Sequence, residues 1–336
     1  MSDLKKLSVS HFQCGLSLIE LMVALALGVV LMLGAATLFV QNKVSYLQDE
    51  ELARIQESGR YAIRYVTRQL SMGGFYGGLL RASDIDNGIF DPNDPSTCFT
   101  YMFEAEKSFE HINDVTSDAG TETGAGANND HSVCIDAADS VQVNTDILIV
   151  RRSKDSITVD QGVPSANATD KVPYIRVRDY NVEVSFENDI ESGDVTSDLD
   201  LWEYYPEIIW VRDYAENAGD NLPTLCRKRL STTTANAVAP VECLVQGVEE
   251  MHVEFGLDSD LDYTVERYEQ FPTEAELTTA ITARVYLLMR SPDEVVGYTN
   301  DKTYIMGSRT VTKNDSYYRR LFQSTVTLRN SEALGI

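Results

Sequence analysis

The pattern of hydrophobic and polar positions separates a long apolar stretch near the start of the chain from the mixed sequence after it. Residues 16–40 contain a single charged side chain, Glu20, and Gly15 stands directly before them. Residues 21–40 are all apolar or small, and about twenty such residues at ~1.5 Å each cross ~30 Å of hydrocarbon. A carboxylate near the end of a membrane-length helix is costly, so Glu20 indicates a functional requirement.

The apolar stretch continues without a break into an amphipathic segment. Apolar or small residues recur there every three or four positions, which is the spacing of one helix face. These residues are Leu52, Ile55, Gly59, Ala62 and Val66. We therefore expect one helix from about Leu16 to Leu70, on the order of 80 Å long. The glycine-rich segment 72–78 then ends it, because glycine favours helix ends and turns.

Further along, the hydrophobic period changes to two residues, which is typical of half-buried β-strands. The runs with this pattern are residues 145–153, 174–187, 207–214, 251–258, 281–291 and 321–330. Residues 113–131 are rich in Gly, Asn, Asp and Thr and predict a surface loop. The expected fold class is α+β, with a long N-terminal helical spine packed on a β-rich, antiparallel globular head.

The charge balance narrows the possible partners. The 336 residues include 28 Lys and Arg against 52 Asp and Glu, a formal net charge of −24. Phosphate contacts need a basic surface, so we expect no nucleic-acid partner. The HExxH, GxSxG, CxxC and phosphate-loop motifs are absent, and the four histidines are scattered along the chain, so we expect no enzymatic activity.

The cysteines predict two disulfides in an exported head. Of the five cysteines, Cys14 lies directly before Gly15, so a cut after that glycine leaves four. Four cysteines allow three connectivities. We expect the two sequence-local pairs, Cys98–Cys134 and Cys226–Cys243, and the alternative is that all four thiols stay reduced and buried.

The order of segments at the N-terminus differs from that of a secretory signal peptide, whose cleavage site follows the apolar core. Here the glycine precedes the core, so a cut there keeps the membrane helix. Lys5 and Lys6 lie on the side expected to stay cytoplasmic, so the head faces outward. The expected segments are a leader (1–15), a transmembrane and assembly helix (16–44), its amphipathic second half (45–72) and a β-rich head (73–336). The alternative is a plain signal anchor whose glutamate reaches the headgroups.

The junction GLSLIELM at residues 15–22 resembles the leader junction of type IV pilins and pseudopilins. The resemblance implies cleavage after Gly15 by a prepilin peptidase and N-methylation of Leu16, where the family more often has Phe. It also gives Glu20 a role, which is to neutralise the buried amino terminus of a neighbouring subunit and set the stagger between subunits. Removing one half of a buried ion pair typically costs about 3–5 kcal/mol.

Further motifs resemble the PilW family of type IV minor pilins. They are QESGRYA at 56–62, the Gly-Gly-aromatic segment at 73–75, VQGVEEM at 245–251 with EFG at 254–256, ARVYLLMRS at 283–291 and RRLFQSTVTLRN at 319–330. Residues 100–225 match no motif that we can name.

The PilW resemblance implies a subunit that helps to prime pilus assembly and sits at or near the pilus tip, supporting adhesion and twitching motility. The implied partners are other minor pilins, the major pilin, the prepilin peptidase, the inner-membrane assembly platform and a tip adhesin, with residues 16–40 in the membrane. The implied location is the inner membrane with the head in the periplasm, and then the pilus tip at the cell surface. The alternatives are a J-type pseudopilin of type II secretion and a membrane-anchored periplasmic binding module.

One acidic segment has the spacing of a calcium loop. Asp258, Asp260, Asp262, Glu266 and Glu269 fall at positions 1, 3, 5, 9 and 12 of a twelve-residue loop. Tyr263 occupies the position where such loops need glycine for a sharp turn. Calcium bound by Asp258, Asp260, Asp262 and Glu269 in a looser hairpin is therefore one reading, and a solvated acidic hairpin is the other. We expect no other cofactor.

Overall fold

The computed structural model describes residues 17–77, 98–102, 107–115, 134–135, 139–160, 163–164, 171–178, 181–185, 200–234 and 237–331. The chain divides into two compact units, residues 1–50 and 51–336, and each is described by itself. The helix α1 (Leu18–Met72) begins in the first unit and ends in the second.

The part of α1 in the first unit exposes its apolar side chains. Leu18, Met32 and Phe39 are each more than two-thirds exposed. In the described part of the chain, α1 is the one helix long and apolar enough to cross a membrane. This composition is stable in hydrocarbon, where helices satisfy all of their backbone hydrogen bonds internally.

The second unit contains the last turns of α1, whose buried face follows the predicted spacing. Ile55, Gly59, Ala62, Val66 and Leu70 are buried. The helix ends at Met72, where the N–H of Gly73 still donates to the carbonyl of Gln69 and Gly74 adopts a positive φ of 75°. The amphipathic pattern and the glycine-rich helix end were therefore readable from the sequence.

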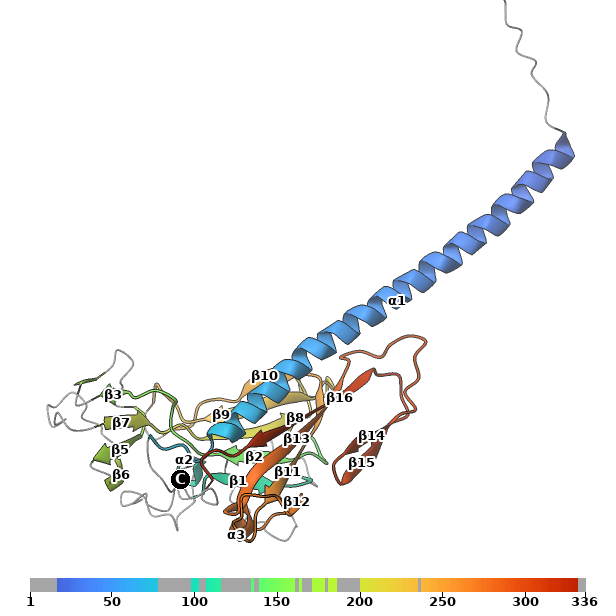
Figure 1. The fold of residues 1–336 in the computed structure, drawn as a ribbon. Coiled ribbons are helices and arrows are strands. Elements are labelled where there is room, and N and C mark those ends of the chain that lie inside the picture. Colours follow the sequence, from blue (N-terminus) through green and yellow to red (C-terminus); the bar gives the residue numbers. More distant parts are fainter. Residues whose placement is uncertain are drawn as a thin grey trace, which may run out of the picture. The chain divides into compact units, whose positions relative to one another are not determined.

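Two antiparallel sheets of the second unit lie beside this end of α1 (Figure 1). The first sheet has the order β1-β2-β8-β9-β10. Its strands are β1 (Phe109–Ile112), β2 (Ile147–Val150), β8 (Glu207–Arg212), β9 (Thr224–Arg229) and β10 (Glu242–Gln246). The second sheet has the order β12-β11-β13-β16. Its strands are β11 (Val248–Leu257), β12 (Arg267–Glu269), β13 (Ala280–Arg290) and β16 (Arg319–Thr327).

Smaller elements complete the described part of the unit. A third sheet, of order β4-β3-β7-β5-β6, contains β3 (Val159–Asp160), β4 (Val163–Pro164), β5 (Tyr174–Arg178), β6 (Asn181–Ser185) and β7 (Asp200–Glu203). A separate hairpin pairs β14 (Thr303–Met306) with β15 (Arg309–Thr312). Two short helices are α2 (Cys98–Met102) and α3 (Glu274–Leu277), and a Thr273–Glu276 capping box begins α3.

Gly247 connects the two large sheets, because it lies between the end of β10 and the start of β11. Its φ is +82°, and a Cβ there would stand 2.6 Å from the carbonyl oxygen of Arg290. Only glycine tolerates both conditions without strain. Immediately after this turn, β11 pairs with β13 and enters the core that α1 also contacts.

The α+β fold class is confirmed, with a long apolar helix and an antiparallel β-rich head. Each of the six predicted runs contains a strand, but residues 174–187 form two, β5 and β6, paired as a hairpin. The described strands that lie outside these runs, and so were not predicted, are β1, β3, β4, β7, β9, β10, β12, β14 and β15. Most of the loop predicted at 113–131 lies outside the described residues.

Candidate functional sites

Reciprocal hydrogen bonds between Ser17 and Glu20 cap the start of α1. The backbone N–H and the hydroxyl of Ser17 donate to the Glu20 carboxylate, at 3.0 and 3.2 Å, and the Glu20 N–H lies 3.3 Å from the Ser17 hydroxyl oxygen. This is a capping box, which the S-x-x-E spacing could have revealed but which our sequence analysis missed. Glu20 therefore has a local partner in the single chain. The predicted cleavage and methylation positions, Gly15 and Leu16, lie outside the described residues.

A hydrogen-bonded network fixes the second half of α1 to the first sheet. The hydroxyl of Tyr65 donates to the Glu207 carboxylate at 2.7 Å, and the Arg227 guanidinium donates to both, at 2.7 and 2.8 Å. Burial raises the pKa of Tyr65, and the nearby Glu207 charge raises it further. The tyrosine is thus a neutral donor throughout the physiological range, and it orients the helix on the sheet.

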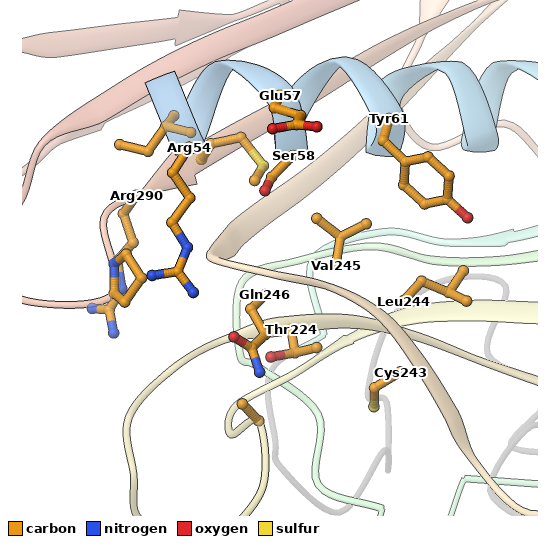
Figure 2. Close-up of a pocket in the computed structure, with 14 residues that line it drawn as sticks. Arg54, Glu57, Ser58, Tyr61, Thr224, Cys243, Leu244, Val245, Gln246 and Arg290 are labelled. Atoms are coloured by element: carbon orange, nitrogen blue, oxygen red, sulfur yellow. The ribbon is translucent and has the colours of Figure 1, made fainter. Parts of the chain in front are cut away.

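A groove lies between α1 and the strands beside it (Figure 2). It has a volume of about 490 Å³ and is lined by α1, β10 and the end of β13. Arg54, Glu57 and Tyr61 come from the helix, and Arg290 comes from β13. All of its lining residues belong to the second unit. The groove was not predicted from the sequence, because it needs both α1 and β13 to form.

The two disulfides of the structure join the expected pairs. Cys226 and Cys243 are register partners on β9 and β10. Cys98, at the start of α2, is bonded to Cys134. Both bridges border one apolar cluster, which also contains Trp210. The disulfides therefore link a core whose parts lie far apart in the sequence.

The predicted calcium loop brings four carboxylates together, but not the four expected. Ligand oxygens of Asp258, Asp260, Asp262 and Glu266 all lie within 4.8 Å of one another. Glu269 lies outside this group, because it belongs to β12 and pairs there with Phe255. The loop backbone is fixed by the buried Asp258, whose carboxylate accepts the N–H groups of Asp262 and Tyr263, at 3.1 and 2.8 Å.

The turn in this acidic loop forms without the glycine that such loops usually have. Leu261 and Tyr263 have φ values of 59° and 68°, a region that non-glycine residues rarely adopt. The hydrogen bond with Glu266, together with burial and the charge of Asp262, raises the pKa of Asp260. The loop therefore holds like charges close together. Calcium binding here stays a prediction.

A buried cluster that the sequence did not predict lies between the two large sheets. The Asp146 carboxylate contacts His111 Nε2 at 2.9 Å and His252 Nδ1 at 3.2 Å, and it accepts the N–H of Val253 at 2.7 Å. All three side chains are 1% exposed or less. Burial raises the pKa of Asp146, but the two imidazoles outweigh burial and hold the pKa well below its usual range.

His252 responds in the opposite direction. Burial lowers its pKa, whereas the adjacent Asp146 carboxylate raises it, and the net shift is upward. The cluster joins β1, the start of β2 and β11, so it stabilises the contact between the sheets. Residues 111, 146 and 252 are separated by long stretches of sequence, and no local pattern connects them.

Comparison with known families finds one match near the start of the chain and one in its last part. Residues 11–36 match the prokaryotic N-terminal methylation motif, which is the motif of prepilin-type proteins. The start of the chain, with its membrane-length helix, is thus similar to that of pilin-type proteins. Residues 210–330 match the family described as type IV pilus-assembly protein W (PilW). No curated protein and no solved structure matches the chain.

The two matches confirm the resemblance found in the sequence and support a type IV minor pilin of the PilW family. The PilW match covers β8 to β16 and therefore includes the groove strands, the acidic loop and the second large sheet. Pilin-type families point to a structural protein rather than an enzyme.

Proposed function

We propose that this protein is a minor pilin that helps to prime type IV pilus assembly, sits at or near the pilus tip, and thereby supports adhesion and twitching motility. The observation that carries the proposal is the combination of a methylation motif at 11–36 with a PilW-type region at 210–330 in one chain. The second half of α1 is packed on that region, so the helix that contains the membrane-length segment continues into the head.

In this proposal the chain is inserted through residues 16–40, with its head in the periplasm. A prepilin peptidase cuts after Gly15 and methylates Leu16, and the assembly platform then extracts the helix into the filament. Glu20 exchanges its local bond to Ser17 for the amino terminus of a neighbouring subunit. The head contacts other minor pilins, the major pilin and a tip adhesin, while the acidic surface disfavours nucleic acid.

Deletion of the gene tests the proposal directly. We expect few or no surface pili and loss of twitching, with both restored by the wild-type gene. Mass spectrometry of the membrane-bound protein should show a chain shortened by its first fifteen residues and methylated at Leu16. Normal piliation with defective protein secretion would instead assign the protein to a type II secretion pseudopilus, and an uncut chain would contradict the pilin mechanism.

A further inference from the structure

The exposed side of α1 in the second unit is basic, although the chain as a whole is strongly acidic. From Arg54 to Arg68 the helix contains four arginines and one glutamate, whereas the chain has a net charge of −24. Arg54, Arg60 and Arg64 are exposed. Arg68 forms an ion pair with Asp155, but none of the other three has an ion pair among the described residues.

Arg290, at the end of β13, extends this basic surface into the groove. Figure 2 shows the side chains of Arg54 and Arg290 at the same end of the groove, with Tyr61 at the other end. The Arg290 guanidinium stacks over the Tyr317 ring at 4.3 Å and donates to the carbonyl of Asn221. Its Nε is buried and has no hydrogen-bond partner. The contacts with Tyr317 and Asn221 thus hold the Arg290 side chain in place at the wall of the groove.

We propose that this arginine face, defined as Arg54 and Arg290 at the groove with Arg60 and Arg64 further along the exposed side of α1, binds an acidic segment of a neighbouring pilus subunit. The inference rests on the proposed function, because it requires neighbours in a filament. Guanidinium groups bind carboxylates in a charge-assisted, often bidentate geometry. Uncompensated like charges that lie close together are relieved by a partner of opposite sign.

The remaining features of the surface fit a protein segment. Tyr61 is 53% exposed beside the arginines, and exposed tyrosine next to arginine is typical of the energetically dominant parts of interfaces. The groove volume of about 490 Å³ holds a few side chains. Because the face combines an aromatic ring with separated cations along a helix, an extended acidic peptide segment satisfies it better than a compact anion.

Photo-crosslinking of the full-length protein in piliated cells tests the inference. Tyr61 is replaced by the photo-reactive residue benzoylphenylalanine, and crosslinked peptides are sequenced by mass spectrometry. We expect a crosslink to a pilin subunit, at a peptide with several Asp or Glu residues. Combining Arg54→Glu with Arg290→Gln should reduce the crosslink about tenfold or more, whereas the control Arg329→Gln, which changes an exposed arginine outside the groove, should not.

Two further measurements keep the test decisive. A non-reducing gel shows whether the double variant has formed its disulfides and therefore folded. If it has not, the crosslink is measured in Arg54→Glu alone, which changes one exposed helix residue. Replacing an acid of the crosslinked peptide by Arg should restore the crosslink to Arg54→Glu. A crosslink to lipid only, to a peptide without acids, or of unchanged yield in the variants overturns the inference. If gene deletion leaves pili intact, the proposed function is wrong. The crosslinking result alone does not test the proposed function.

Discussion

Gly59 of α1 lies directly against the ring of Phe322 on β16. A Cβ at Gly59 would stand 2.2 Å from the nearest ring carbon, which is closer than any real contact. The helix and the second sheet therefore approach each other only because this position has no side chain. Gly59 was expected on the buried face of the helix, but its partner was not, because nearly the whole head separates the two residues in sequence.

The Gly59–Phe322 contact predicts an unusual effect of Gly59→Ala. In a helix interior this change normally stabilises by roughly 0.5–1 kcal/mol. Here we expect a destabilisation of about 1–3 kcal/mol, the usual cost of overpacking. In a Phe322→Ala background the clash is absent, so the same change should become neutral or stabilising. Urea unfolding of the four proteins in detergent measures this coupling, and additive effects would show that the ring moves aside without cost.

The disulfide between Cys226 and Cys243 predicts a loss of stability on its removal. The two residues are 17 apart in sequence, and closing a loop of about this length stabilises by about 3 kcal/mol in the chain-entropy model. We expect the double variant Cys226→Ser, Cys243→Ser to unfold at lower urea concentration, followed by the fluorescence of the buried Trp210. An unchanged midpoint would mean that strand pairing alone holds β9 and β10 together.

Local patterns in the sequence were sufficient for α1 and for most of the second sheet. The apolar spacing at Ile55, Ala62 and Val66 reports a buried helix face, and alternation reports β11 and β13. Strand β9 was not predicted because its second half consists of three basic residues, Arg227, Lys228 and Arg229, and lacks the alternation of a strand. Their charges are compensated by Glu207, Glu242 and Asp139 from other elements, which only the folded chain brings near.

Among the candidate sites too, those formed by neighbouring residues could be predicted from the sequence, and those formed by distant residues could not. The cap made by Ser17 and Glu20 is local, and its S-x-x-E spacing could have predicted it although it was missed. The groove and the Asp146 cluster each join segments that are distant in the sequence. In the acidic loop, three of the four predicted carboxylates lie close together. Glu269 does not join them, because β12 pairs with β11 at that residue.

The Asp146 cluster predicts that stability depends on pH in two directions. The pKa of Asp146 is lowered in the folded state, so its contribution is complete above about pH 4 and is lost as the pH falls. The pKa of His252 is raised above 6.5, so its contribution is complete below that value and is lost as the pH rises through the folded pKa. We therefore expect maximal stability near pH 5–6.

Unfolding by urea between pH 4 and pH 9 measures this dependence. The variant His252→Asn cannot titrate, so it should lose the decline above pH 6.5 while keeping the acid decline. Nearby charges also face the cluster, namely Asp114, Glu250, Glu254 and Arg309. A variant with the same alkaline decline as the wild type would exclude His252 as its source.

The acidic loop predicts weak calcium binding. Four carboxylate ligands on a turn suit a hard cation, and sites in extracellular modules typically bind it at about 10⁻⁴–10⁻³ M. We expect calorimetry of the purified protein to show heat at millimolar calcium, and the bound cation should lower the raised pKa of Asp260. Asp260→Asn with Asp262→Asn should abolish the heat, whereas Glu269→Gln should not. No heat with the wild type would establish a solvated hairpin.

The observed bond of Glu20 to Ser17 and its proposed bond to a neighbouring amino terminus can be tested separately. Glu20→Gln keeps an oxygen that accepts from Ser17 but removes the charge that would neutralise a neighbouring amino terminus. Ser17→Ala removes the cap, at a cost of about 1 kcal/mol, but keeps the charge. We therefore expect Glu20→Gln to be cleaved and folded yet absent from sheared pili, and Ser17→Ala to be incorporated normally. Immunoblots of sheared fibres and membranes measure both. If Glu20→Gln were incorporated normally and Ser17→Ala were lost from fibres, Glu20 would act by capping α1, because the variant that keeps the cap would then assemble without the charge.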